Sequence, residues 1–154
     1  MKASRLRRVF SFWPPFLFAG IRVTQISDDF RYARVELRMR WYNRNYVGTH
    51  FGGSLFSMTD PFWMILMLRR LGPDYLVWDQ AGEIQFLKPG KGTVVAEFRL
   101  DDAVVDEVRG AAAGGEKVLR WFEVDVRNAE GEVVARVRKQ LYVRRKRDRP
   151  AGPA

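Results

Sequence analysis

The segment from Phe62 to Leu68 constrains the fold more than any other part of the sequence, because its seven residues are all apolar. If this segment is helical, no face of the helix can be left to water, so the helix is either buried in protein or spans a membrane. Seven residues are too few to span a bilayer, and charged residues border the run at Asp60 and at Arg69-Arg70. We therefore expect a helix buried inside a domain, and no membrane span.

Alternating apolar and polar residues predict an antiparallel sheet around this helix. Residues 31–42 have the period of two that is typical of a half-buried strand. The side chains on its apolar face would be Ala33, Val35, Leu37, Met39 and Trp41. Further elements are predicted as strands at 21–27, 75–87, 93–100, 118–127 and 133–143, and as a short helix at 101–112. Since strands can bury one face by curling around an apolar helix, we predict an α+β domain whose antiparallel sheet wraps around a central helix of about residues 53–71.

The length of 154 residues suits one domain, and 47% apolar residues are enough to build its core. Residues 1–143 are predicted to form this domain, and residues 144–154 a basic, disordered tail. Basic and apolar residues at the N-terminus imitate a secretory signal, but Pro14-Pro15 interrupts the apolar run and no A-x-A cleavage pattern follows. We expect instead a short amphipathic helix, which would pack Phe10, Trp13, Phe16 and Phe18 onto the domain.

The net charge of +9 is concentrated at the two ends of the chain. Residues 1–20 contain four basic residues and no acid, and residues 144–154 contain five basic residues and one acid. Such ends are usually solvated, although they can bind anionic surfaces in a salt-dependent way. No zinc-finger, helix-turn-helix or RNP-like motif accompanies the charge, so we predict no specific nucleic-acid partner.

The chain contains no cysteine and only one histidine, His50. This excludes disulfides, thiolate metal sites and cysteine nucleophiles, and it suits a reducing compartment, which leads us to expect a cytoplasmic protein without a metal or cofactor.

Asp60 is the residue most suggestive of chemistry, because it lies in the helix that is expected to be buried. A buried carboxylate has a raised pKa and can act as a general base or nucleophile near neutral pH. Pro61 has no N–H, so the helix should kink here and free the carbonyl of Ser57. The alternative is structural: Asp60 bonds Ser57 or Thr59, or caps a neighbouring segment.

Gly52-Gly53 open the predicted helix, where backbone N–H groups can approach a ligand and polarise a carbonyl. A flexible entry to the helix is the alternative. His50 and Ser54 do not suggest a serine hydrolase, because the chain has no G-x-S-x-G motif and no second histidine.

The run Asn45-Tyr46-Val47-Gly48-Thr49-His50-Phe51-Gly52-Gly53, followed by Asp60, resembles the hot-dog fold thioesterases of the phenylacetate-pathway type. Residues 84–92 look like the strand and turn that follow the central helix in that family. Together with Trp13-Pro14-Pro15-Phe16 and Val77-Trp78-Asp79, the pattern is most similar to the DUF4442 subgroup.

The resemblance implies a dimer, or a dimer of dimers, that hydrolyses acyl-coenzyme A or a related thioester at the subunit interface, with coenzyme A entering only as part of the substrate. Asp60 would then be the base or nucleophile, while the Gly52 and Gly53 amides would polarise the thioester carbonyl. Asn45 would lie near the attacking water, and Asp79 would be a second carboxylate that positions it. Substrate contacts would come from His50, Phe51, Lys88 and Lys91, the two lysines meeting the coenzyme A phosphates.

This chain departs from the family pattern at Phe51, where the motif usually has histidine. That departure leaves open a non-catalytic module that binds acyl groups or thioesters. A hot-dog dehydratase or isomerase is a further alternative, with His50 as its histidine, and so is a basic-tailed protein acting on nucleic acid or a membrane.

Overall fold

The structure is a computed structural model that describes residues 1–146. Its strands form one antiparallel sheet in the order β1-β2-β4-β5-β6-β3. The strands are β1 (Ile21–Ile26), β2 (Tyr32–Arg38), β3 (Tyr75–Phe86), β4 (Thr93–Arg99), β5 (Val118–Arg127) and β6 (Val133–Arg145). The helices are α1 (Ala3–Phe12), α2 (Pro14–Ala19), α3 (Gly52–Ser57), α4 (Phe62–Leu71) and α5 (Asp102–Ala111).

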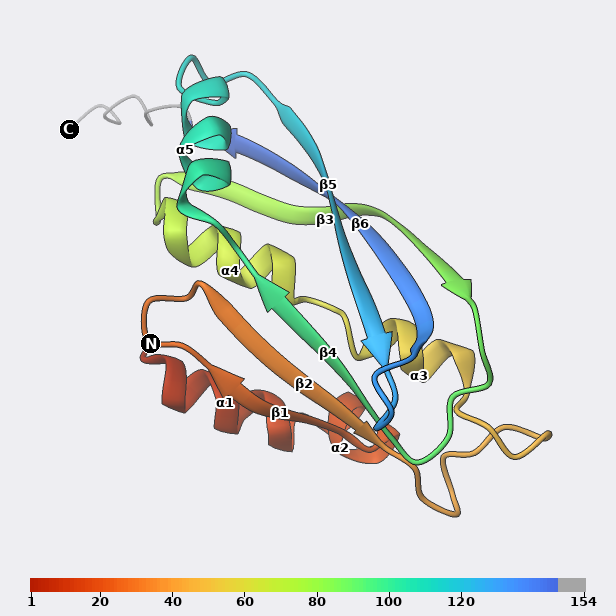
Figure 1. Ribbon diagram of the computed structural model, residues 1–154. Coiled ribbons are helices and arrows are strands. Elements are labelled where there is room, and N and C mark those ends of the chain that lie inside the picture. Colours follow the sequence, from red (N-terminus) through yellow and green to blue (C-terminus); the bar gives the residue numbers. More distant parts are fainter. Residues whose placement is uncertain (147–154) are drawn as a thin grey trace.

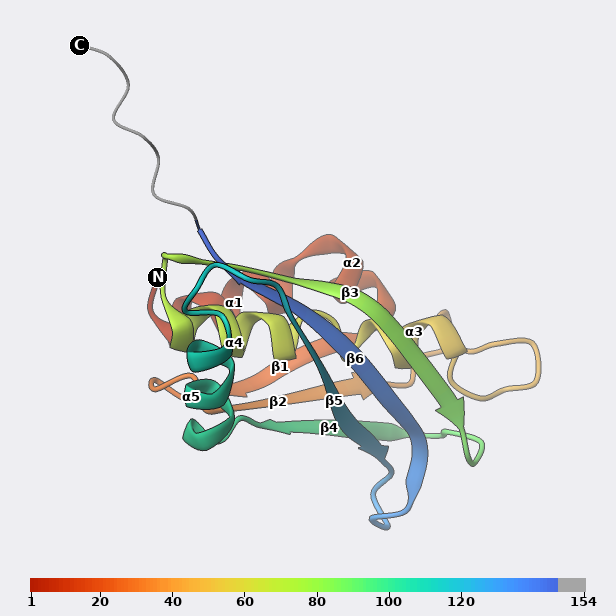
Figure 2. The ribbon, with the colours of Figure 1, turned by 90° about the horizontal axis from the view of Figure 1, so that it is seen from above.

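The sheet curves around α3 and α4, which follow one another through the middle of the molecule (Figure 1 and Figure 2). This confirms the predicted α+β hot-dog architecture. The central helix is interrupted at residues 58–61, where Pro61 has no N–H to continue the hydrogen-bond ladder. The expected kink is thus a break between two helices, and α4 restarts with a bond from Ile65 N–H to Pro61 O.

Side chains of α4 fill the place where the sheet opens. Only two residue pairs join β4 to β5. The indole of Trp63 stacks on Phe122 of β5 with ring centres 4.9 Å apart, and it meets Phe98 of β4 edge-on at 5.4 Å. The apolar run therefore has partners on both sides, which explains why a helix without a polar face is stable here.

The N-terminal helices lie along β1 at one edge of the sheet (Figure 1). Phe10 and Phe16 each lie 6.2 Å from the ring of Phe62, as predicted. The prediction is wrong for Phe18, which is 73% exposed, whereas Trp13 is 44% exposed and packs against the ring of Phe16 at 5.2 Å. The reason is that a new helix begins at Pro14, and this change of direction leaves Phe18 on the outer face.

Two strand ends differ from those predicted by more than one residue. Strand β2 ends at Arg38, and Trp41 is 82% exposed rather than on the apolar face, because the Asn43 side chain accepts a bond from Arg40 N–H and closes a turn there. Strand β6 continues to Arg145, so Arg144 and Arg145 pair with β3 and are not part of a tail. Residues 147–154 of the predicted tail lie outside the described residues. No helix within residues 1–146 is both long and apolar enough to cross a bilayer.

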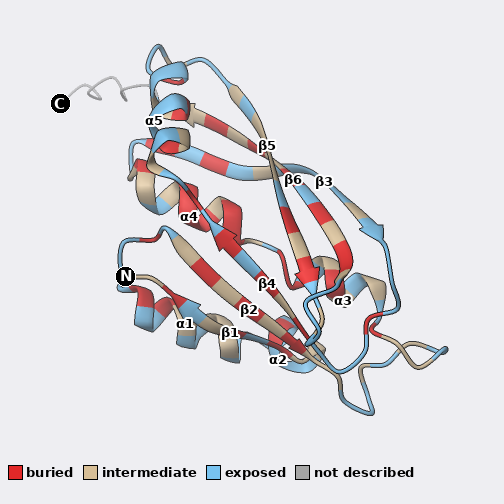
Figure 3. Ribbon diagram, viewed as in Figure 1, coloured by how far each residue is buried: buried red, intermediate tan, exposed pale blue. Residues whose placement is uncertain are grey.

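Strand β3 forms the edge of the sheet opposite β1. Within the described chain it pairs on one side only, with β6. Its second half, residues 80–86, is almost entirely exposed, as the pale blue colour of this segment shows in Figure 3. The apolar side chains exposed on this strand are Leu76, Trp78 and Phe86.

Candidate functional site

The break in the central helix places Asp60 in a tight turn between α3 and α4. The N–H of Asp60 donates to the Ser57 carbonyl at 3.1 Å, and the following peptide bond to Pro61 is cis. The Thr59 hydroxyl is buried and donates to Phe56 O at 2.7 Å. Because backbone and hydroxyl groups of the turn bond one another, the carboxylate of Asp60 is left free to point elsewhere.

That carboxylate meets a buried lysine on the inner face of the sheet. Lys139 of β6 has a side chain that is 5% exposed, and its Nζ donates to Oδ2 of Asp60 at 3.3 Å. The same ammonium lies 4.2 Å from the ring centre of Phe56 in α3. A buried ammonium needs an opposite charge or an aromatic face, and here it has both.

Asp79 of β3 completes what we call the acid–lysine cluster: Asp60, Asp79 and Lys139. Oδ1 of Asp79 is buried, with no hydrogen-bond partner among the described residues. Burial raises the pKa of Asp79; the Lys139 ammonium acts in the opposite direction, and the Asp60 carboxylate raises the pKa further. The cluster therefore places two carboxylates close to one ammonium group.

The prediction that Asp60 is buried is wrong for the single chain, because its side chain is 51% exposed. The helix does not run through the core at this point but turns at its surface. Asp79 is the more buried of the two carboxylates, with its Oδ1 atom out of contact with solvent. The structural alternative is also wrong for Ser57 and Thr59: only the backbone N–H of Asp60 bonds Ser57, and the carboxylate binds Lys139.

A separate cavity of about 470 Å³ lies at the start of α3. It is lined by the end of β3 and the turn after it, residues 86–90, and by six residues of the loop and helix: Asn45, Val47, Thr49, His50, Gly52 and Leu55. Of the predicted site residues it includes Asn45, His50, Gly52 and Lys88. Asp60 and Asp79 do not line it, so within one chain the predicted residues fall into two groups at opposite ends of α3.

Asn45 organises the loop that forms this cavity. Its Nδ2 donates to Thr49 Oγ1 at 2.8 Å, and its Oδ1 accepts from the Thr49 N–H at 2.9 Å. A longer bond of 3.3 Å reaches the carbonyl of His50. These contacts use both the donor and the acceptor of the Asn45 amide. The side chain therefore stabilises the loop and does not offer a free polar group to the cavity.

His50 anchors the loop to the turn that follows β3. Its side chain is buried, and Nε2 lies 2.8 Å from the Gly92 carbonyl. Since a carbonyl accepts, the hydrogen is on Nε2, and Nδ1 is an acceptor without a partner among the described residues. Burial lowers the pKa of His50, so the ring is neutral near pH 7.

Gly52 and Gly53 allow two aromatic rings to approach the first turn of α3. A Cβ atom on Gly52 would lie 2.7 Å from Phe86, and one on Gly53 would lie 2.4 Å from the ring of Phe51. No side chain caps the N–H groups of this turn, and such groups have no partner within a helix. The two glycines therefore let the rings of Phe86 and Phe51 pack closely, and the N–H groups of this turn remain free to bind a ligand.

The other three predicted substrate contacts, Phe51, Lys88 and Lys91, are exposed, and of these only Lys88 also lines the cavity. Phe51 is 58% exposed beside Gly53. Lys88 forms an ion pair with Glu132 at 2.6 Å, and Lys91 is exposed and does not line the cavity. Within residues 1–146 no three acidic or histidine side chains are close enough together to bind a metal ion.

Sequence reasoning missed Lys139. A signal was present, because β6 alternates and its inward positions are otherwise apolar: Ala135, Val137, Leu141 and Val143 are all buried. A lysine in such a series marks a buried charge, and a buried charge requires a partner.

A family model described as a domain of unknown function, DUF4442, matches residues 3–143. Among solved structures, a Pseudomonas aeruginosa protein, PA5026, described as of unknown function and "probable thioesterase", superposes with a TM-score of 0.84 at 21% identity, covering 94% of this chain and 97% of that one. The Haemophilus influenzae thioesterase HI1161 gives 0.68 at 14% identity, covering 94% and 92%. The Escherichia coli PaaI protein, from the phenylacetic acid degradation operon, gives 0.61 at 16% identity, covering 90% of each chain. These identities show a shared fold. No curated protein matches the sequence.

Proposed function

Since the chain belongs to the DUF4442 family and has the hot-dog fold of its thioesterase neighbours, we propose that it hydrolyses acyl thioesters of the acyl-coenzyme A kind. The observation that carries the proposal is the acid–lysine cluster. A half-exposed carboxylate, Asp60, is held by a buried lysine at the break of the central helix, with a second carboxylate of raised pKa beside it.

In the proposed reaction, Asp60 takes a proton from a water molecule, and the oxygen of that water attacks the thioester carbonyl. The C–S bond breaks, giving a carboxylic acid and a thiol that leaves with a proton. Lys139 fixes the position of the Asp60 carboxylate, and Asp79 orients the water. The amides of Gly52 and Gly53 would polarise the carbonyl, a role that comes from the resemblance, as does the choice of base over nucleophile for Asp60.

The proposal includes a second copy of the chain. Asp60 and Gly52 lie at opposite ends of α3 and share no cavity in one chain, so an interface that brings the two groups together would complete the site. The free edge of β3 with its exposed Leu76, Trp78 and Phe86 is the surface we assign to that contact, because such an edge invites pairing with another strand.

Light scattering on protein eluted from a size-exclusion column tests whether the chain forms a dimer. Ala81→Lys places a charge on the exposed second half of β3 and should give a monomer. Gln25→Lys, on the exposed side of the opposite edge strand, is the matched control and should leave the dimer intact. A wild type that elutes as a monomer would contradict this part of the proposal.

Thiol release from a panel of acyl-coenzyme A substrates tests the activity. The chain has no cysteine, so a thiol reagent reports coenzyme A without background from the protein. Asp60→Asn should lower kcat by about 100-fold or more, the range of general base catalysis. Asp106→Asn, the same change at an exposed position of α5, should leave kcat unaltered. Full activity in Asp60→Asn would reject the assignment.

Non-catalytic binding of an acyl thioester is the second candidate, favoured by Phe51, whose ring lies over Gly53 at the start of α3. Binding of acyl-coenzyme A without thiol release by the wild type would select it. A dehydratase would depend on His50, whose ring is buried and bonded to Gly92, and an unaffected His50→Ala variant would remove that option. The absence of a further cofactor and a place in the cytoplasm stay predictions.

A further inference from the structure

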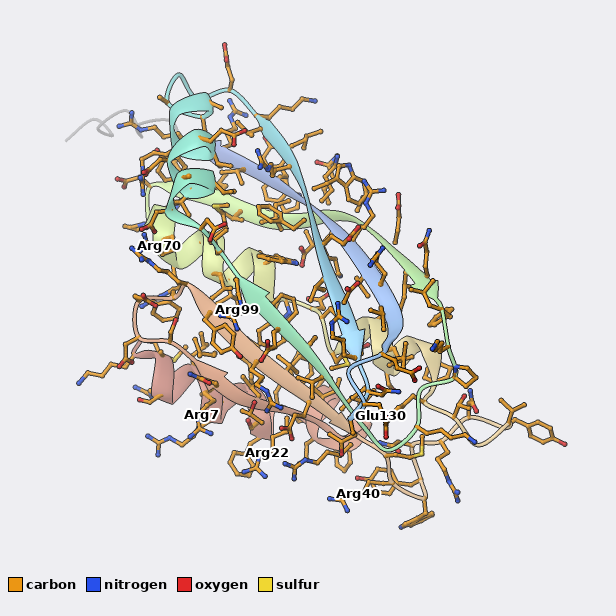
Figure 4. All side chains as sticks on the ribbon, viewed as in Figure 1. Arg7, Arg22, Arg40, Arg70, Arg99 and Glu130 are labelled. Carbon is orange, nitrogen blue, oxygen red and sulfur yellow. The ribbon has the colours of Figure 1, made fainter. Side chains whose placement is uncertain are left out.

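A groove lined by five arginines lies on the side of the molecule away from β3. Its volume is about 520 Å³, and it is formed by α1, α2, β1 and the segment after β2. We call it the arginine groove; its arginines are Arg7, Arg8, Arg22, Arg38 and Arg40. Figure 4 shows Arg7, Arg22 and Arg40 following one another along the lower edge of the molecule.

The charge of this groove is largely uncompensated. Arg38 pairs with Glu36 at 2.8 Å, but none of the other four has a carboxylate within 4 Å among the described residues. Elsewhere arginines are commonly paired, as Arg120 is with Glu107 and Arg136 with Asp125. Residues 1–27 contain no acid at all. Four unpaired guanidinium groups around one groove repel each other unless an anion lies between them.

Exposed apolar side chains border the groove. Phe12 of α1 and Leu17 of α2 line it and are 71% and 46% exposed. Val9 of α1 and Phe18, which follows Leu17 in α2, are 51% and 73% exposed. A smaller hollow on α1 is lined by Arg5, Arg8, Val9 and Phe12, and it shares Arg8 and Phe12 with the arginine groove. Basic and apolar groups thus form one continuous surface, which we call the α1–α2 face.

We propose that the α1–α2 face docks the protein on a bilayer surface rich in anionic phospholipid. Headgroup phosphates would occupy the arginine groove, and Phe12, Leu17 and Phe18 would lie at the boundary between headgroups and acyl chains. A basic helix with exposed aromatic residues on the same side is the arrangement that binds such interfaces. Arginine also binds phosphate with two parallel hydrogen bonds, which favours it over lysine here.

Two other occupants fit the face less well. A soluble phosphate compound would balance the arginines but would leave the apolar side chains in water. A second copy contacting through the same face would bring two sets of unpaired arginines together, since a two-fold contact is self-complementary. An anionic bilayer would both neutralise the arginines and remove the apolar side chains from water.

Sedimentation with lipid vesicles tests the proposal on the full chain. We expect binding to vesicles of phosphatidylcholine mixed with phosphatidylglycerol at about 0.1 M salt, little binding to phosphatidylcholine alone, and release at about 1 M salt. A variant with Arg7, Arg8 and Arg22 each changed to Gln should bind about 100-fold more weakly, since each basic group near an anionic surface contributes about fivefold. Phe12→Ser with Phe18→Ser should also weaken binding at unchanged net charge.

The matched control removes the same charge from the opposite part of the sheet. Arg120→Gln, Arg127→Gln and Arg136→Gln change partly exposed, ion-paired arginines on β5 and β6, and they should weaken binding far less than the groove variant. Arg147→Gln with Arg149→Gln measures the share of the C-terminal charge and should leave most of the binding. Thermal unfolding of every variant separates loss of binding from loss of fold.

Several outcomes would overturn the docking surface without touching the hydrolase proposal. One is equal binding to neutral vesicles; another is an equal loss in the control triple variant. Saturable binding of pyrophosphate in the absence of lipid, unchanged by Phe12→Ser with Phe18→Ser, would assign the groove to a soluble phosphate. Self-association that the groove variant abolishes, with no vesicle binding, would assign the face to a second copy.

Discussion

Lys139 reaches Asp60 from inside the protein: the ion pair of 3.3 Å joins a side chain that is 5% exposed to one that is 51% exposed. The cation is thus desolvated while its partner carboxylate can still meet water. A fixed charge in a dry environment holds its partner more firmly than one in solvent does. For a carboxylate that must present one oxygen to a water molecule, this arrangement supplies orientation without burying the reacting group.

Lys139→Met should separate the role of the ion pair in activity from its role in stability. We expect kcat to fall by about 100-fold, because a misplaced catalytic group costs this much. The unfolding temperature should fall, because the substitution removes one partner of the ion pair and leaves Asp60 and the partly buried Asp79 without their cation. Arg138→Met, at the preceding residue, which lies on the outer face of β6, is the control. Equal kcat in wild type and Lys139→Met would remove Lys139 from the mechanism.

Asp79→Asn should stabilise the protein near neutral pH. The pKa of Asp79 is raised in the folded state, chiefly by burial. Below the ordinary aspartate pKa of about 3.9, both states are protonated and no penalty exists. As the pH rises above that value the unfolded chain loses its proton first, so the folded state loses stability until the pH has passed the raised pKa.

Asn does not ionise, so the variant escapes this loss. The gain should stay below about 1.4 kcal/mol per unit of pKa difference, because solvent screens a partly exposed group. Denaturant unfolding of wild type and variant from about pH 4 to pH 8 measures it. A difference that is constant across this range would show that the effect is not protonation of Asp79.

The sequence was sufficient for the architecture because its signals are local. Strict alternation predicts strands, and an unbroken apolar run predicts a buried helix; both patterns depend on neighbours along the chain. Strand ends were harder to predict where a hydrogen bond from a residue outside the strand determines them. Strand β2 ends at Arg38 because Asn43 bonds the backbone of Ala19 and Arg38, contacts that no periodicity encodes.

The site was predictable only in part for the same reason. Asp60 and Asp79 stand out in the sequence as acids in apolar surroundings, but which of them is buried depends on how the helix breaks and how β3 passes it. Lys139 lies 79 residues from Asp60, and the pairing follows from the order of strands in the sheet. A long-range contact of this kind requires the topology first.

Gly82→Ala should disturb the cluster without changing any charge. A Cβ atom on Gly82 would lie 2.7 Å from Cζ of Phe56 and 3.2 Å from Cδ of Lys139. The Phe56 ring must therefore move, and with it the partner that holds the Lys139 ammonium. We expect a loss of stability of about 1 kcal/mol or more from overpacking and a lower kcat.

Gly110→Ala is the matched control, because a Cβ atom there meets nothing within 4 Å. This glycine lies in helix α5, where alanine is favoured by about 1 kcal/mol, so the control should be more stable than wild type. Thermal unfolding and thiol release on both variants decide the point. A Gly82→Ala protein as stable and active as wild type would mean that the Phe56 ring does not support the lysine.

His50 should make the protein less stable as the pH falls below about 6.5, the ordinary histidine pKa. Burial lowers the pKa of His50 in the folded state, so the unfolded chain takes up a proton before the folded protein does. Stability is therefore fully present above pH 6.5 and is lost as the pH falls toward the lowered pKa, by at most about 1.4 kcal/mol per pH unit for one proton.

His50→Gln removes the titration and keeps an N–H donor for the Gly92 carbonyl, which His50 now bonds at 2.8 Å. Because His50 is the only histidine, the difference between the wild-type and variant unfolding curves from about pH 7.5 to pH 5 isolates this one group. We expect the wild type to lose free energy of unfolding relative to the His50→Gln variant as the pH is lowered. Parallel curves would mean that His50 titrates as it does in the unfolded chain, and that its ring is open to water rather than locked under the turn.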